Sequence, residues 1–208
     1  MIKINKIILA SKSKARYNLL VNLGINAEIL KVFPTGADES LEGGILPKDA
    51  VIELSLRKSQ IVFDDLKNLN DFNSSSDLII AADTVVVHNG KILGKPSDEA
   101  DAFKTLSALS GSNHEVYSGI SLILDGKILY DYDVTKVRFR EIDPKEIDVY
   151  IKTGDSLSKA GSYGAEGMGS AFIEKIEGDF FNIVGLPVNK FVNMLKTGWD
   201  LTVFDLIF

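Results

Sequence analysis

The stretch Leu78-Ile79-Ile80-Ala81-Ala82-Asp83-Thr84 decides the fold. Its unbroken apolar run, Leu78–Ala82, is typical of a central β-strand that is covered on both faces. Such strands occur in sheets with helices on both sides, so the run predicts an α/β protein. Asp83 and Thr84 follow the run directly, and we expect them at the carboxyl edge of the sheet, where α/β proteins place their binding sites.

Strand and helix patterns alternate on both sides of this stretch. We expect further strands at Ile4–Ala10, Ala27–Phe33, Val116–Leu124 and Ile128–Phe139. Apolar residues at helical spacing predict helices at Lys14–Leu23, Lys48–Leu66, a segment after Ser97 or Asp98, Pro144–Lys152 and Val188–Leu195. The pairs Asn89-Gly90 and Asp125-Gly126 predict tight hairpins. The predicted fold is therefore α/β, with a mixed sheet and flanking helices.

Composition and charge narrow the class of protein. A mass of 22.8 kDa suits one domain or two closely fused lobes. The formal net charge of −6 argues against a nucleic-acid partner bound through a broad basic face. The longest uncharged stretch, Tyr17–Ala27, is too short to span a bilayer, and the N-terminus does not resemble a signal peptide. We expect a cytoplasmic protein without a membrane partner.

The residue inventory limits the chemistry. The chain has no cysteine, which excludes disulfides, thiol nucleophiles and thiolate zinc sites. Its two histidines, His88 and His114, cannot build a multi-histidine zinc centre. A divalent metal would therefore be held by oxygen ligands, which favours Mg²⁺ or Mn²⁺.

Ser11-Lys12-Ser13-Lys14-Ala15-Arg16 joins the first predicted strand to the first predicted helix. A helix N-terminus offers free backbone N–H groups to a phosphate. Ser11 and Ser13 can add hydrogen bonds, and Arg16 can hold phosphate oxygens in a bidentate contact. The alternative is that a serine only caps the helix while the cations are solvated. This segment is the first candidate phosphate site.

Carboxylates later in the chain are candidates for metal binding and for activating water. Asp83, together with Asp38-Glu39 in the predicted loop Thr35–Leu46, could supply oxygen ligands for magnesium and a base for water. The alternative is that Asp83 makes a local turn and Glu39 faces solvent.

Two lysines have unusual settings. Lys58 falls within the apolar arc of its predicted helix, where it either snorkels to solvent or is aimed at an anion in a cleft. The opposite, solvated arc carries Asp49, Glu53, Arg57, Gln60 and Asp64. Lys95 follows a hairpin strand and is fixed by Pro96 behind it.

A glycine-rich segment runs from Gly161 to Gly169 and contains Glu166 as its one charged group. Glycines let the backbone approach a ligand closely, and Glu166 could read a base edge through hydrogen bonds. The alternative is an irregular turn with an exposed glutamate. Because GxGxxG, Walker and GxSxG fingerprints are absent, the residues alone support only an α/β protein with a candidate phosphate site.

Taken together, short segments of the chain resemble the Maf family of nucleoside triphosphate pyrophosphatases. The matching segments are Leu9–Arg16, Asp38-Glu39, Leu54–Lys58, Ala82–Val85, Leu93–Pro96, Leu109–Gly111, His114–Gly119, Lys159–Gly164 and Val184–Pro187. The resemblance implies a single Maf-like domain over residues 1–196, with a tail of open role at 197–208. It also implies an elongated, two-lobed Maf/ITPase-like architecture around a central cleft, often as a homodimer.

The same resemblance implies an enzyme. The reaction would hydrolyse a nucleoside triphosphate between its α and β phosphates, with Mg²⁺ or Mn²⁺, and give the monophosphate and pyrophosphate. By motif, the catalytic residues would be Asp83, Glu39, Lys58 and Lys95, with Asp83 as proton acceptor and with Asp83 and Glu39 also binding the metal. The substrate-binding residues would be Ser11, Ser13, Arg16, Thr84, Ser118 and Glu166.

Departures from the family pattern concern the choice of base. Members that act on dTTP and UTP usually have Pro-Arg and Gln where this chain has Lys14-Ala15 and Glu166. A carboxylate only accepts hydrogen bonds, whereas an amide also donates, so Glu166 weakens a contact that donates to a pyrimidine carbonyl. In its glutamate alone the chain resembles the branch that acts on 7-methyl-GTP. We expect nucleoside or deoxynucleoside triphosphates as substrates, with dTTP, UTP and modified nucleotides as candidates, and the preferred base stays open.

The second candidate function is a nucleotide-binding regulator of septum formation or cell division that binds without significant turnover. The absence of the family's arginine at Ala15 keeps this alternative open.

Overall fold

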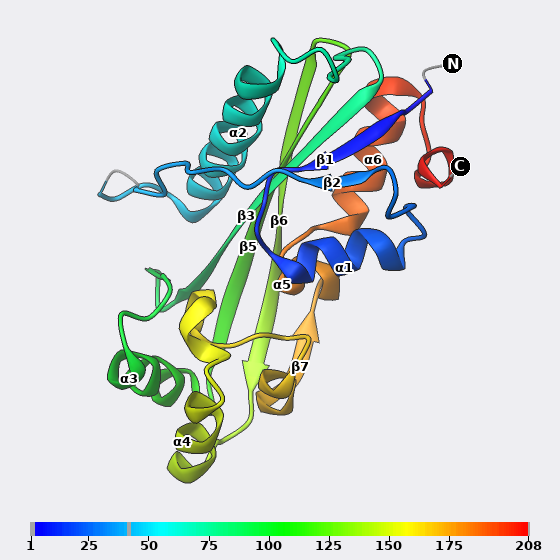
Figure 1. The fold of residues 1–208 in the computed structure, drawn as a ribbon. Coiled ribbons are helices and arrows are strands. Elements are labelled where there is room, and N and C mark those ends of the chain that lie inside the picture. The colour runs from blue at the N-terminus through cyan, green and yellow to red at the C-terminus, as the bar shows by residue number, and fades with distance from the viewer. Residues whose placement is uncertain (1–2, 41–42, 208) are drawn as a thin grey trace. The chain divides into compact units, whose positions relative to one another are not determined.

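The computed structural model describes residues 3–40 and 43–207, which fold into helices and one mixed sheet (Figure 1). In chain order the strands are β1 (Lys6–Leu9), β2 (Leu30–Val32), β3 (Asp77–His88), β4 (Lys91–Leu93), β5 (Asn113–Leu124), β6 (Lys127–Phe139) and β7 (Ile173–Glu177). The α-helices are α1 (Lys14–Asn22), α2 (Pro47–Leu66), α3 (Glu99–Leu109), α4 (Pro144–Lys152), α5 (Phe180–Val184) and α6 (Val188–Trp199). Among the described residues, we find no helix whose length and apolar character would let it cross a membrane.

The sheet contains both strand orientations. Its order is β2-β1-β3-β5-β6-β7, and β4 pairs with β3. β1 runs parallel to β2 and to β3, with Ile8 opposite Lys31 on one side and opposite Ile79 on the other. β4 is antiparallel to β3, and β7 is antiparallel to β6. The predicted α/β class with a mixed sheet is confirmed.

Both predicted hairpins have the backbone that their sequences require. Asn89 and Gly90 have φ values of 50° and 73°, and Asp125 and Gly126 have 50° and 69°. Positive φ at both central residues defines the type I′ turn, whose twist matches that of the flanking strands. The hairpin predictions are therefore confirmed.

Other boundaries differ from those predicted. β2 is shorter than Ala27–Phe33, and β3 continues beyond Ala82 to His88. β7 and α5 were not predicted, because β7 has no apolar alternation and no buried residue, and α5 is a single short turn of helix. Residues 41–42 of the predicted loop, residues 1–2 of the predicted domain and residue 208 of the predicted tail lie outside the described residues.

The chain divides into two compact units. The first comprises the described parts of residues 1–83, 118–133 and 185–208, and the second comprises residues 84–117 and 134–184. The chain passes from the first unit to the second within β3, between Asp83 and Thr84.

In the first unit, α2 packs closely on β5. A Cβ on Gly119 would come within 2.1 Å of the Val51 carbonyl oxygen, so only glycine allows this approach. The Ser59 and Ser121 hydroxyls form a buried hydrogen bond of 2.7 Å between the same two elements. The surrounding apolar cluster consists of Ile8, Ala10, Val62, Leu66, Ile79, Ala81 and Ile123.

The C-terminal segment after α6 belongs to the packing of the first unit. Leu201 and Leu206 are buried, at 1% and 0% exposure. Between them, the Thr202 hydroxyl and amide both donate to the Asp205 carboxylate. The described part of the tail is therefore folded against the core.

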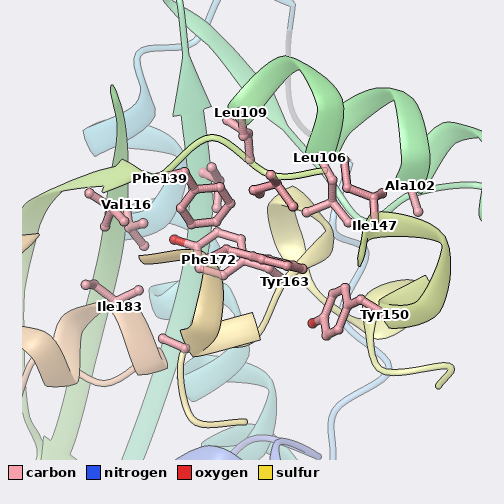
Figure 2. Close-up of a cluster of buried hydrophobic side chains, with 14 of the residues drawn as sticks. Ala102, Leu106, Leu109, Val116, Phe139, Ile147, Tyr150, Tyr163, Phe172 and Ile183 are labelled. Atoms are coloured by element: carbon pink, nitrogen blue, oxygen red, sulfur yellow. The ribbon is translucent and has the colours of Figure 1, made fainter. Parts of the chain in front are cut away.

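The second unit has an aromatic core, which Figure 2 shows in close-up. Phe139 from β6 packs edge-on against Tyr163 with ring centroids 4.7 Å apart, and lies 5.9 Å from Phe172. Tyr150 from α4 packs edge-on against Phe172 at 5.1 Å. Apolar residues of α3, including Leu106, complete the cluster (Figure 2).

Candidate active site

Asp83 lies in β3, where the apolar run ends. Leu78 to Ala82 are fully buried, and Asp83 is 8% exposed. The strand does not stop at Ala82, so the prediction that Asp83 follows the end of a strand is wrong in that detail. Its parallel neighbour β1 nevertheless ends at Leu9, opposite Ile80. Asp83 therefore lies just beyond the end of the parallel pairing, which agrees with the expected position of a site in an α/β sheet.

Helix α2 brings Lys58 to this carboxylate. Pro47 occupies the first turn of the helix, where its missing N–H costs nothing. Lys58 lies on the buried face with Val51, Leu54 and Val62, and it is 7% exposed. The helical-wheel prediction that Lys58 shares the apolar arc is confirmed, and its ammonium group is aimed at carboxylates.

The Lys58 ammonium joins two carboxylates. Its Nζ donates to Oδ1 of Asp83 at 2.6 Å and to Oε1 of Glu39 at 2.8 Å. Glu39 comes from the loop before α2, and its side chain is 49% exposed. Both carboxylates therefore converge on one point, closed on the Asp83 side and open on the Glu39 side.

The loop that carries Glu39 is attached to the solvated face of α2. The Arg57 guanidinium donates to the carbonyl oxygens of Asp38 and Ser40 and also pairs with Glu53. The Ser40 hydroxyl and amide both donate to the Asp38 carboxylate, and these hydrogen bonds lower the pKa of Asp38.

The predicted phosphate segment begins α1. Ser13 caps the helix, with its Oγ accepting from the Arg16 amide at 3.3 Å. The Arg16 side chain is buried, and it donates to Ser11 Oγ at 3.1 Å and to the Gly185 carbonyl at 2.7 Å. Lys12 and Lys14 are exposed. The segment thus fixes one guanidinium and two serine hydroxyls together.

Arg16 is electrostatically coupled to the carboxylates. Burial lowers the pKa of Arg16, and the negative charges of Asp83 and Glu39 act in the opposite direction. Two cations, Arg16 and Lys58, therefore balance two anions in this part of the first unit. We call Arg16, Glu39, Lys58 and Asp83 the lysine cluster.

The remaining predicted residues are distributed as follows. Ser118 is fully buried in β5 of the first unit. Thr84, Lys95 and Glu166 belong to the second unit, where Lys95 and Glu166 are exposed. Desolvation raises the pKa of Glu166, with Lys159 opposing the shift. The roles expected for these four residues stay predictions.

The chain's own residues fit a divalent ion that arrives with phosphate. Among the described residues, no group of three or more histidine and carboxylate side chains could hold a metal. The lysine cluster instead offers two carboxylates that already share one cationic partner. Mg²⁺ is commonly held by one or two carboxylates together with substrate phosphates and water. Glu39 and Asp83 would hold such an ion.

A separate cavity of about 530 Å³ lies in the second unit. None of the predicted site residues lines it. Its charged lining residues are Glu115, Lys136, Arg138, Lys175 and Glu177. Three of these are in ion pairs, since Arg138 pairs with Glu174 and Lys175 pairs with Glu177.

Sequence reasoning missed two contributors to the site. Arg57 has the spacing of a solvated helix residue, and Gly185 lies in a segment that matches the family pattern without an expected role. Their contacts involve backbone carbonyls, of Asp38 and Ser40 for Arg57 and of Gly185 itself for Arg16. Because every residue has a carbonyl, no residue type signals such a contact.

The fold and the lysine cluster define a class: an α/β protein whose buried cations and convergent carboxylates suit phosphate chemistry. The chain belongs to the Maf family, because the family model described as Maf-like protein matches residues 6–198.

Curated relatives are similar over nearly the whole chain. A dTTP/UTP pyrophosphatase of Bacillus cereus is 41% identical over 191 residues, covering 92% of this chain and 94% of its own. A dTTP/UTP pyrophosphatase of Clostridium perfringens is 42% identical over 203 residues, covering 95% and 99%. The solved structure of the Staphylococcus aureus Ham1 protein covers 81% of this chain and 79% of its own, with a TM-score of 0.43 and 17% identity. The family assignment does not depend on that last similarity.

Proposed function

We propose that this chain hydrolyses nucleoside triphosphates between the α and β phosphates and releases the nucleoside monophosphate and pyrophosphate. The observation that carries the proposal is the convergence of Asp83 and Glu39 on the Lys58 ammonium, close enough to Arg16 for their charges to affect it. The proposal is supported by relatives of about 41% identity that are named dTTP/UTP pyrophosphatases.

Arg16 and the serines would bind phosphate oxygens. Arg16 is held at its Nε by the Gly185 carbonyl, so its orientation is fixed before a ligand arrives. Ser11 and Ser13 lie at the start of α1, where the free N–H groups and the helix dipole favour an anion. A triphosphate, with about four negative charges, would gain most from such a preorganised cationic site.

Lys58 would exchange partners when substrate binds. In the structure, its ammonium pairs with both Asp83 and Glu39. A bound divalent ion would supply positive charge to the two carboxylates and to the phosphates. Lys58 would then be able to donate to phosphate oxygens while it remains anchored on α2.

Asp83 is the residue that would take the proton of the attacking water. A water oxygen joins one phosphorus of the α–β bridge as the bridging P–O bond breaks, and the water proton passes to the carboxylate. Asp83 suits this task because the buried end of β3 fixes its position, whereas Glu39 is half exposed on a loop. Glu39 would complete the metal site.

The first proposed substrates are dTTP and UTP, because these nucleotides appear in the names of the relatives. Ala15 and Glu166 depart from the pattern of that branch, so the comparison of bases is part of the test. The names also favour turnover over the alternative of a regulator that only binds.

The deciding experiment is product analysis. The protein is incubated with dTTP, UTP, CTP, GTP or 7-methyl-GTP and with Mg²⁺ or Mn²⁺, and the products are separated by anion exchange. We expect equal amounts of monophosphate and pyrophosphate, and no product when the metal is chelated. Release of orthophosphate would contradict the proposed bond cleavage. Tight nucleotide binding without product would favour the binding-only regulator.

A further inference from the structure

Arg57 directly precedes Lys58 on α2, but it lies on the solvated face of the helix, whereas Lys58 lies on the buried face. Its guanidinium is only partly exposed, with 30% of the side chain accessible. Nη1 donates to the carbonyl oxygens of Asp38 and Ser40, and Nη2 pairs with Glu53 one helical turn earlier. One planar side chain thus connects a rigid helix to two points of an irregular loop.

Those two points flank Glu39. The Asp38 and Ser40 carbonyls are the main-chain acceptors on either side of that residue, and the Ser40 amide and hydroxyl close the same turn onto the Asp38 carboxylate. The main chain is therefore held on both sides of the glutamate, while the glutamate side chain reaches Lys58. Arg57 and Lys58 act on the same loop from adjacent positions of α2.

Arg57 clamps the loop to α2 through the Asp38 and Ser40 carbonyls, and this contact is better suited to fixing the loop than to stabilising the whole fold. An exposed ion pair such as Arg57–Glu53 contributes little to folding. A guanidinium, however, has its donors in a fixed fork, which suits it to hold two acceptors at once. An ammonium group at the same position would lack that planar fork.

We propose that Arg57 is a positioning residue, which holds Glu39 where its carboxylate meets that of Asp83. This role rests on the proposed function, because its consequence is the affinity of the site for a divalent ion. Residues that orient metal ligands commonly change metal affinity or activity by about 10–100-fold when they are replaced. Arg57 would act through the position of Glu39 and not by contact with the metal or the substrate.

The first test measures the loop directly, by hydrogen–deuterium exchange without nucleotide or metal. In Arg57→Ala we expect peptides from residues 34–40 to exchange at least about tenfold faster, with peptides from α2 unchanged. Arg57→Lys should recover only part of the protection. The matched control is Lys67→Ala, which removes a half-exposed ion pair with Asp64 at the C-terminal end of the same helix and should leave the loop unchanged. Unchanged loop exchange in Arg57→Ala would overturn the clamp.

The second test measures the metal site. Mn²⁺ binding is followed by electron paramagnetic resonance in the presence of the α,β-methylene analogue of UTP, which cannot be cleaved at that bridge. We expect the Mn²⁺ dissociation constant to rise about 10–100-fold in Arg57→Ala and to be unchanged in Lys67→Ala. Faster loop exchange with unaltered Mn²⁺ affinity would overturn the positioning role. Absence of pyrophosphate from the wild type would instead overturn the proposed function, without altering the exchange result.

Discussion

Each of the two units buries a pair of polar groups, and the two pairs are built in opposite ways. In the first unit, Lys58 and Asp83 form a charged pair at 2.6 Å, and the half-exposed Glu39 adjoins it. In the second, His114 Nε2 and the Tyr163 hydroxyl form a neutral hydrogen bond of 2.8 Å among aromatic rings. Burial lowers the pKa of His114 to about 4 and keeps the second pair neutral near pH 7.

This difference separates a group kept for chemistry from one kept for packing. Burying charges is costly even when they are paired, so an ion pair is weak support for a fold. The lysine cluster does, however, bring two carboxylates to one point. The His114 ring instead packs edge-on at 4.8 Å against Phe139, where a proton would be poorly solvated. The lysine cluster is therefore the better candidate for chemistry, and the histidine is the better candidate for packing.

The largest expected effect is on turnover, through Asp83→Asn. Loss of the carboxylate removes the proposed proton acceptor, and general-base catalysis is typically worth about 10²–10⁴-fold. The amide oxygen can still accept from Lys58, so we expect the fold to persist. The measurement is the rate of pyrophosphate release, with circular dichroism to verify folding.

Asp131→Asn is the matched control for this prediction. It makes the same chemical change in a partly exposed ion pair with Lys190, also in the first unit. We expect its turnover to equal that of the wild type. Full activity of Asp83→Asn would contradict the proposal that Asp83 accepts the proton of the attacking water. The contrast between a chemical role for the lysine cluster and a packing role for His114 would then lose its support.

The next effect is on stability, through Lys58→Met. Methionine suits the apolar face of α2, but it leaves Asp83 buried without its ammonium partner. Breaking a buried pair in this way costs roughly 3 kcal/mol of the free energy of unfolding, measured by urea denaturation. Lys58→Met combined with Asp83→Asn should recover most of that loss, because the uncompensated charge is gone.

Lys67→Met provides the control, since its ion pair with Asp64 is about half exposed. We expect a change within about 0.5 kcal/mol. If the double variant were as unstable as Lys58→Met alone, the ion pair would be a structural element, and the contrast with the histidine would fail.

Much of the lysine cluster was predictable because its residue types carry local signals. Lys58 interrupts an apolar helical arc, and Asp83 directly follows an apolar run, so the local sequence pattern makes both residues candidates. The hairpins were predictable for the same reason, because Asn-Gly and Asp-Gly favour positive φ. Glu39 was harder, since a glutamate in a polar loop has no periodic context, and the family resemblance singled it out.

The rest depends on contacts between distant segments. Arg57 has the spacing of a solvated helix residue, and only the loop's return to α2 gives it two carbonyl partners. β7 shows no apolar alternation, because its strand is partly exposed, and its pairing with β6 alone defines it. The extension of β3 past Asp83 similarly depends on its pairing with β4, opposite Val86 to His88.

The smallest expected effect concerns pH and the histidine half of the comparison. In the folded protein, burial, with a lesser contribution from His88, lowers the pKa of His114 to about 4. In the unfolded chain the pKa is near 6.5, so between these values the unfolded state binds the proton more tightly. The contribution of this histidine to stability is therefore complete above about pH 6.5 and falls as the pH drops toward 4, by on the order of 2 kcal/mol between pH 7 and 5.

Urea denaturation at both pH values should show this loss in the wild type and a much smaller one in His114→Phe. Phenylalanine leaves the Tyr163 hydroxyl without its partner, but that cost is the same at both pH values, so the difference between them isolates the proton. His88→Asn, at the chain's other histidine, should retain most of the loss. If His114→Phe lost as much stability between pH 7 and 5 as the wild type, the loss would arise at other groups. His114 would then accept its proton in the folded state, and the aromatic core would not hold it neutral.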